Sequence, residues 1–183
     1  LNSFTFKGSE AVTIEISRPT NLIVLNCIEI DVTGCSIVDA GGQEQSAERI
    51  DYDIDEETVK LKFVGELPSG SAELTLHFKG VLNDKLRGFY RSKYMDNDGS
   101  EKYLATTQLE ATDARRAFPC WDEPNIKATF DVELVVHSEL QAVSNMPVYI
   151  EEQLETGLKR VCFETTPIMS TYLLAFVVGE LES

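Results

Sequence analysis

The sequence has few of the residues that build disulfide scaffolds or metal sites. Its 183 residues include only four cysteines and two histidines. The cysteines are too sparse for a disulfide-stabilised fold and too scattered for a zinc ribbon, and no Asn-x-Ser/Thr glycosylation sequon occurs. We therefore expect unpaired, buried thiols and a cytoplasmic location, where the compartment is reducing. The four residues are Cys27, Cys35, Cys120 and Cys162.

Long apolar runs are also lacking. The longest, Tyr172–Val178, is far too short to cross a bilayer, and we interpret it as a strand buried on both faces. Leu1–Gly8 has no basic segment followed by a long apolar one, so it does not resemble a signal peptide. It alternates like a strand, and we expect the chain to begin partway into a fold.

Positive charge is scarce as well, because the net charge is -15. A nucleic-acid surface needs lysine and arginine concentrated on one face, so we expect no nucleic-acid partner, and the short apolar runs predict no membrane partner. A solubilising acidic surface is the simplest interpretation of the charge. Attraction of cationic peptides is the alternative.

Alternation of polar and apolar residues is the dominant pattern that is present. It is seen in residues 12–16, 50–54, 59–63, 74–78 and 130–136. Each pattern predicts a strand with one buried face and one solvent face, as in antiparallel sheets.

Turn-forming residues separate these strands. We expect tight reversals at Pro68–Gly70, Asp96–Gly99 and Glu155–Gly157. Helical periodicity is weak, and only a short helical turn is expected at Thr112–Ala117, with Asp113 as its cap. Many short strands joined by turns predict an all-β fold, a saddle-like antiparallel β-sandwich that forms a single domain over residues 1–183.

One long segment breaks the pattern. Thr106–Lys127 reads TTQLEATDARRAFPCWDEPNIK and holds the only tryptophan. A long irregular segment in a compact β domain is usually functional or a structural clasp. We interpret its charged residues mainly as ion pairs that shape the loop, with substrate contact as the alternative, and we expect Phe118–Trp121 to anchor it on the core. The charged residues are Asp113, Arg115, Arg116, Asp122 and Glu123.

This segment resembles a motif of the M1 zinc aminopeptidases (gluzincins), most closely of their puromycin-sensitive, cytosolic branch. Three other stretches agree in order and spacing: Leu67–Gly70 with the strand that follows it, Gly88–Tyr94, and Met169–Gly179. The resemblance covers essentially the whole chain. It implies the N-terminal β domain of such an enzyme, lying in cis against a thermolysin-like catalytic domain.

The resemblance also implies where the chemistry resides. The catalytic domain of the family carries a Gly-x-Met-Glu-Asn motif and a His-Glu-x-x-His zinc helix, and neither occurs in this chain. His77 and His137 are sixty positions apart, and each lies in an alternating strand. We therefore expect zinc in the full-length enzyme but no metal site and no catalytic residue here, so that the isolated chain cleaves no peptide.

Glu110 and Gln108 are the expected substrate-binding residues. In the resembling family, the glutamate at the position of Glu110 reaches into the catalytic domain and binds the free ammonium of the peptide N-terminus, and Gln108 lines the same pocket. The resemblance further implies a cis peptide bond between Glu110 and Ala111. A fixed carboxylate suits ammonium binding because charge-assisted hydrogen bonds are strong. Residues two apart in a strand point the same way, so the pair is physically coherent.

Two other functions stay open. One is a non-catalytic scaffold or interaction domain that keeps the M1 architecture without the zinc motif, as in a subunit of a general transcription factor. The other is a freestanding β-sandwich binding module, which predicts an aromatic-lined groove. The presence of Gln108 and Glu110 favours the enzyme, because a scaffold has no need of them.

Overall fold

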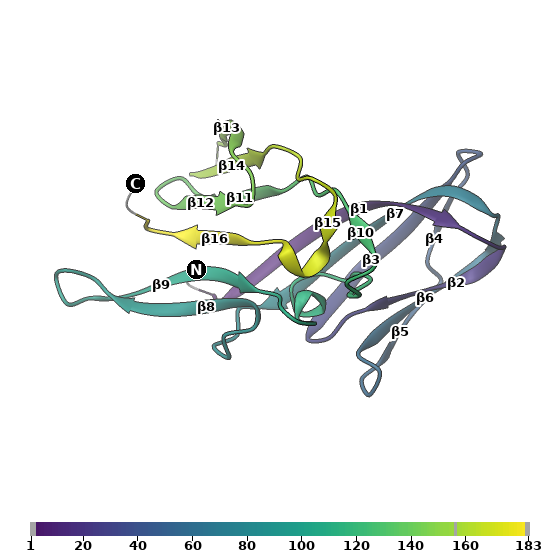
Figure 1. Ribbon diagram of the computed structural model, residues 1–183, viewed down its shortest axis with the longest axis horizontal. Helices are drawn as coiled ribbons and strands as arrows, with labels where there is room; N and C mark the ends of the chain where they lie inside the picture. The colour runs from purple at the N-terminus through teal and green to yellow at the C-terminus, as the bar shows by residue number, and fades with distance from the viewer. Residues whose placement is uncertain (1–2, 156, 182–183) are drawn as a thin grey trace. The chain divides into compact units, whose positions relative to one another are not determined.

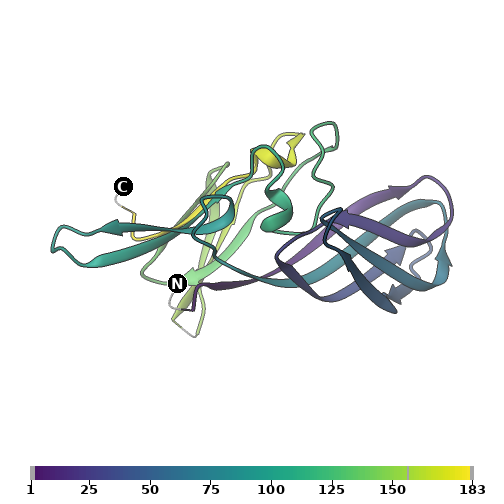
Figure 2. The same ribbon diagram turned by 90° about the horizontal axis from the view of Figure 1, so that it is seen from below.

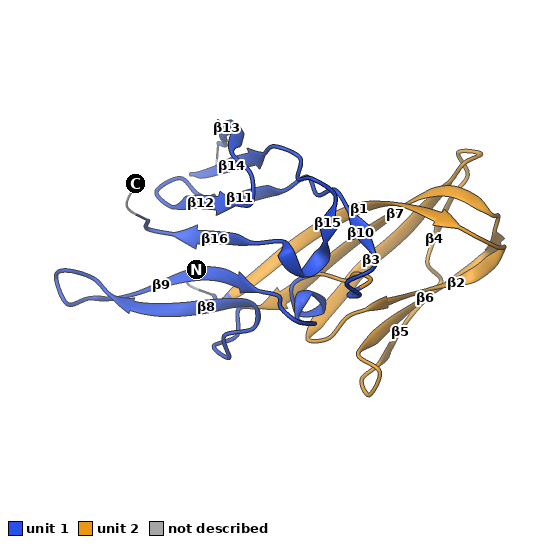
Figure 3. Cartoon of the chain, viewed as in Figure 1, with its two compact units in different colours: residues 1–4, 82–117, 122–183 blue, residues 5–81, 118–121 orange. Residues whose placement is uncertain are grey.

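The computed structural model describes residues 3–155 and 157–181, and Figures 1 and 2 show it from two directions. Within these residues the secondary structure consists of strands and two short 3₁₀ helices, and all pairings between the strands are antiparallel. The predicted all-β antiparallel class is confirmed. The chain divides into two compact units, which Figure 3 colours separately.

Unit 2 comprises Thr5–Val81 and Phe118–Trp121. Its strands are β1 (Thr5–Ile16), β2 (Thr20–Asn26), β3 (Ile30–Asp39), β4 (Glu44–Ser46), β5 (Arg49–Asp53), β6 (Thr58–Leu67) and β7 (Gly70–Val81). They form a four-stranded sheet in the order β1-β7-β3-β4 and a three-stranded sheet in the order β2-β6-β5.

The core of unit 2 lies between the inner faces of these two sheets. Val59, Leu61 and Phe63 of β6 have no solvent exposure, and neither do Leu74 and Leu76 of β7. All five belong to one hydrophobic cluster. The period-two alternation therefore placed the buried faces of β6 and β7 correctly.

The connection at Pro68–Gly70, where the sequence predicts a tight reversal, joins two strands that do not pair with each other. β6 pairs with β2 and β5, whereas β7 pairs with β1 and β3. The short connection thus passes the chain from one sheet to the other. Turn residues alone do not specify whether the strands on their two sides pair with each other.

Unit 1 comprises Leu1–Phe4, Leu82–Ala117 and Asp122–Ser183. Its elements are β8 (Gly88–Met95), β9 (Glu101–Gln108), η1 (Ala114–Arg116), β10 (Lys127–Ala128), β11 (Glu133–His137), β12 (Gln141–Ser144), β13 (Val148–Gln153), β14 (Leu158–Phe163), β15 (Met169–Ser170), η2 (Thr171–Leu173) and β16 (Phe176–Gly179). Its sheets have the orders β12-β16-β9-β8, β11-β14-β13 and β10-β15.

The hairpin of β8 and β9 is the longest feature of unit 1 in Figure 1. The two strands pair without interruption from Gly88 with Gln108 to Met95 with Glu101. The predicted turn between them is present, since the Gly99 amide donates to the Asp96 carbonyl at 2.9 Å. Of the third predicted turn, Thr156 lies outside the described residues, although β13 and β14 on its two sides do pair.

The interpretation of Tyr172–Val178 as one strand buried on both faces is wrong. The 3₁₀ helix η2 takes up Thr171–Leu173, β16 begins only at Phe176, and Leu173 is half exposed. The Asn145 side chain donates to the Leu173 carbonyl at 2.9 Å and accepts from the Ala175 amide at 2.7 Å. These side-chain contacts take the place of ladder hydrogen bonds before β16.

All four cysteines are free and buried. Burial raises the pKa of the Cys27 thiol to about 12 and that of Cys35 to about 11, so both are inert neutral groups in the core. No helix within the described residues is long and apolar enough to cross a membrane.

Candidate functional site

The candidate substrate-binding residues lie where β9 ends. Gln108 is the last residue of β9 and pairs with Gly88, the first residue of β8. Leu109 is buried, whereas Gln108 and Glu110 on its two sides are exposed. The alternation of exposed and buried residues therefore continues beyond the strand, as far as the turn residue Glu110.

The peptide bond between Glu110 and Ala111 is cis, so this expectation is confirmed. Glu110, Ala111 and Thr112 are all exposed. Within residues 3–155 and 157–181, the side chains of Gln108 and Glu110 form no hydrogen bond or ion pair. Both side chains are available to a ligand.

The far end of this exposed stretch is fastened by backbone hydrogen bonds. The Asp113 amide donates to the Leu109 carbonyl at 2.9 Å, and the Arg116 amide donates to the Asp113 carbonyl at 3.1 Å. Ala114, the first residue of η1, has no solvent exposure. The Leu109–Ala117 turn thus presents three exposed residues between two buried anchors.

The predicted helical turn is present as η1, but the predicted side-chain cap is wrong. The Asp113 carboxylate makes no capping hydrogen bond. Instead it accepts from Nε of Arg116 at 2.7 Å, and the Arg116 side chain is only 8% exposed. A guanidinium so far removed from water needs a carboxylate partner, which explains why the side chain of Asp113 turns to it.

A second ion pair closes the segment. Oδ2 of Asp122 accepts from Nε of Arg115 at 3.0 Å and from the Arg115 amide at 3.3 Å. The Asp122 side chain is 2% exposed and that of Arg115 is 11% exposed. Asp113, Arg115, Arg116 and Asp122 therefore shape the loop, as the sequence predicted, whereas Glu123 is exposed.

Gly88 is a residue that the sequence did not single out by itself. Its φ of +67° lies in the left-handed region, and a Cβ built there would stand 2.5 Å from Cβ of Arg116 and 3.4 Å from the Asp113 carbonyl oxygen. Only glycine meets both conditions. In the sequence, a glycine at the start of a strand is the only signal of this contact, because Gly88 and Arg116 lie far apart in the chain.

Phe118–Trp121 belongs to unit 2 and is anchored there as expected. Cys120 and Asn26 exchange two backbone hydrogen bonds, of 2.8 and 3.1 Å. Phe118 and Trp121 pack against the hydrophobic cluster of unit 2.

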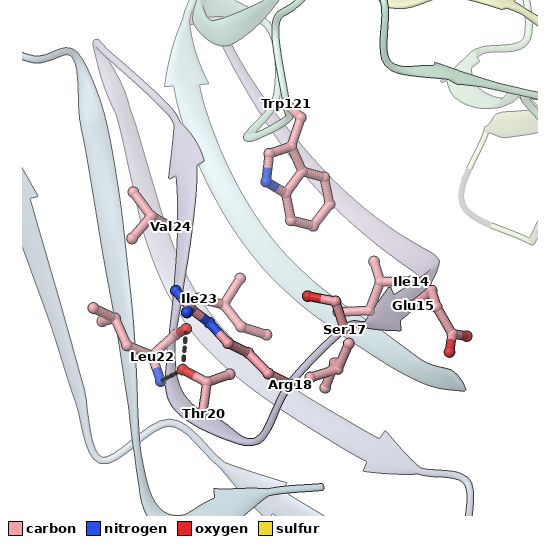
Figure 4. A pocket seen from close by; sticks show the side chains of 10 residues that line it. Ile14, Glu15, Ser17, Arg18, Thr20, Leu22, Ile23, Val24 and Trp121 are labelled. Atoms are coloured by element: carbon pink, nitrogen blue, oxygen red, sulfur yellow. Dashed lines mark hydrogen bonds between the residues drawn. The ribbon is translucent and has the colours of Figure 1, made fainter. Parts of the chain in front are cut away.

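A hollow of about 280 Å³ lies beside Trp121 in unit 2. Figure 4 shows the side chains around it, which come mainly from β1 and β2 and include Ile14, Ile23 and Val24. Trp121 is the one aromatic residue among those that line it. The hollow is not the aromatic-lined groove that a freestanding binding module predicts.

The described residues do not fit a zinc ion. His77 lies on β7 of unit 2 and His137 ends β11 of unit 1. Among residues 3–155 and 157–181, no group of three or more His, Cys, Asp and Glu side chains could hold a metal ion.

Curated relatives match nearly the whole chain. Aminopeptidase M1-B of Oryza sativa subsp. japonica is 47% identical over 179 residues and Aminopeptidase 2 of Candida albicans is 45% identical over 181, each covering 98% of this chain. The puromycin-sensitive aminopeptidase of Caenorhabditis elegans is 42% identical over 183 residues, which is 100% of the chain. The chain spans only 19–20% of these relatives.

The match extends to a family model. Residues 1–173 match the model of the peptidase M1 N-terminal domain. The resemblance drawn from the sequence is therefore confirmed over almost its full length. This chain belongs to the peptidase M1 family and corresponds to its N-terminal domain.

Proposed function

We propose that residues 1–183 form one domain of a zinc-dependent aminopeptidase, which removes N-terminal residues from peptides. The catalytic zinc domain belongs to the rest of the parent, because this chain spans about a fifth of relatives that are named aminopeptidases and has no zinc motif. The isolated chain is then inactive and binds no zinc tightly. Four buried free thiols support a cytoplasmic location for the parent.

The role of this domain in the proposal is to recognise the substrate N-terminus through Glu110, with Gln108 beside it. The observation that carries it is an exposed carboxylate without a partner in the described residues, presented by a turn whose two ends are buried. An aminopeptidase must distinguish a terminal ammonium from an internal amide. A carboxylate held in place does so, since a hydrogen bond between charged groups contributes about 1.5–3 kcal/mol.

Replacement of Glu110 in the full parent tests this role. Glu110→Gln keeps the shape of the side chain and removes its charge, so kcat/KM for a peptide with a free N-terminus should fall about tenfold to a hundredfold. Part of the loss is expected in kcat, because the contact also orients the scissile bond.

Thr112→Ala is the matched control, since Thr112 is exposed on the same turn. It should leave kcat/KM within about twofold of wild type. A Glu110→Gln enzyme with wild-type kcat/KM would show that the carboxylate does not anchor substrate and would favour the scaffold alternative.

A further inference from the structure

We propose that Gly88 is a positioning residue for Glu110, and that it acts by seating the Asp113–Arg116 ion pair. This inference rests on the proposed function of Glu110. No contact between Gly88 and the substrate is proposed. It determines where the Leu109–Ala117 turn lies, and so where the Glu110 carboxylate is presented.

Strand pairing connects Gly88 with the backbone that leads to Glu110. Gly88 lies directly across the β8–β9 ladder from Gln108. Glu110 follows Gln108 by two residues, with buried Leu109 between them. The backbone that leads to Glu110 therefore continues directly from the residue that is paired with Gly88.

The Leu109–Ala117 turn approaches Gly88 closely. Cβ of Arg116 occupies the space where a side chain of residue 88 would begin, since the two Cβ atoms would be only 2.5 Å apart. Real Cβ atoms do not come so close. Neither atom can rotate away, because the position of a Cβ atom is set by its backbone. Any side chain at position 88 must therefore displace η1, because β8 is held in register by β9.

Hydrogen bonds connect the displaced residue to the backbone on both sides of Glu110. Arg116 is tied to Asp113 through Nε at 2.7 Å and through its amide at 3.1 Å. Asp113 is tied through its amide to the Leu109 carbonyl at 2.9 Å. Only Glu110, Ala111 and Thr112 lie between these tied residues, so a shift of Arg116 is passed on to the three exposed residues. A misplacement of about 1 Å in a substrate-orienting group costs on the order of a hundredfold in rate.

The test is a double-mutant cycle in the full-length parent enzyme. Gly88→Ala is made in the wild type and in Glu110→Gln, and kcat and KM are measured with a peptide that has a free N-terminus. We expect a loss in kcat/KM on the order of tenfold or more in the wild-type background and less than about twofold in Glu110→Gln. Thermal unfolding and zinc content are measured for every variant.

The control is Gly99→Ala at the tip of the same hairpin. Gly99 has a similar φ of +82°, but a Cβ there meets no atom within 4 Å. It imposes the same kind of backbone strain without the contact with η1. Its kcat/KM should stay within about twofold of wild type.

A second variant covers the case in which Gly88→Ala fails to fold. Asp113→Asn weakens the tie to Arg116 without adding atoms, and it should lower kcat/KM several-fold in the wild-type background but not in Glu110→Gln. Equal losses in both backgrounds, for either variant, would mean a general structural effect and overturn the positioning role. So would wild-type kcat/KM in Gly88→Ala.

The failures of the two proposals are distinguishable. If Glu110→Gln itself keeps wild-type kcat/KM, the proposed function is wrong and the positioning role falls with it. If Glu110→Gln is impaired and Gly88→Ala is not, only the positioning role is wrong.

Discussion

The core of unit 2 and the Leu109–Ala117 turn of unit 1 are held in shape by different interactions. In unit 2, apolar side chains of β6 and β7 are fully buried and form one cluster. In the turn, shape depends on backbone hydrogen bonds and on the ion pair of Asp113 with Arg116. Apolar packing is non-directional, whereas ion pairs and hydrogen bonds specify geometry.

Under the proposed role of Glu110, that difference separates the residues that stabilise the fold from the residue that recognises substrate. The side chains that form the core of unit 2 are apolar and face away from solvent, so they offer no polar group to a substrate. The turn leaves Glu110 exposed while its neighbours Leu109 and Ala114 are buried. A recognition carboxylate needs this combination of exposure and a fixed backbone.

The largest effect on stability is expected in the core. Phe63→Ala should lower the free energy of unfolding by about 3–5 kcal/mol, because it removes a fully buried ring and leaves a cavity. Denaturant unfolding of this chain measures it. Val64→Ala on the same strand is the control, since Val64 is 77% exposed and its loss should change stability by about 0.5 kcal/mol or less. Similar losses for both variants would contradict the assigned core.

Breaking the buried ion pair of the irregular segment should have a smaller effect. Asp122→Asn removes the charge that Arg115 binds and should cost about 1.5–3 kcal/mol in the same unfolding experiment. Asp51→Asn breaks the exposed pair with Arg49 and should cost less than about 1 kcal/mol. Equal costs would show that burial does not strengthen the Asp122 contact.

Glu10 is a polar exception inside unit 2. Its Oε1 is buried without a hydrogen-bond partner within the described residues, and burial raises its pKa from 4.5 to about 8. At pH values between 4.5 and about 8, Glu10 keeps its proton in the folded chain but has released it in the unfolded chain. Stability from this group is therefore full below about pH 4.5 and falls as pH rises toward 8.

Glu10→Gln should remove this pH dependence. The stability of the variant relative to wild type should rise between pH 5 and pH 8, by up to about 1.4 kcal/mol per pH unit. Urea unfolding across this range measures the difference. The exposed Glu15 on the same strand supplies the control, because Glu15→Gln should track the wild type. A flat difference for Glu10→Gln would mean that the carboxyl reaches water in solution.

Local patterns predicted the strands but not how they connect. Alternation placed the buried faces of β6 and β7, and Asp96–Gly99 marked the turn of the β8–β9 hairpin. The crossing between sheets at Pro68–Gly70 was missed because pairing partners are chosen by long-range packing. The break in Tyr172–Val178 was missed because it depends on the side chain of Asn145, distant in the sequence.

The candidate site was predictable only in part. Gln108 and Glu110 came from the resemblance of their segment to a family, since an isolated glutamate carries no signature of function. The proposed role of Gly88 depends on a contact through space with Arg116, 28 positions later, which no local pattern encodes. A structure was needed to bring the glycine, the ion pair and the carboxylate together.

The most direct test of the account compares two competitive ligands of the full parent enzyme that differ only in the N-terminal amino group. One is a peptide analogue with a free ammonium, and the other is its des-amino counterpart. We predict that Glu110→Gln lowers the preference for the ammonium ligand about tenfold to a hundredfold, with the inhibition constant of the des-amino ligand unchanged within about twofold. Equal weakening of both ligands, or an unchanged preference, would contradict the claim that Glu110 binds the substrate N-terminus.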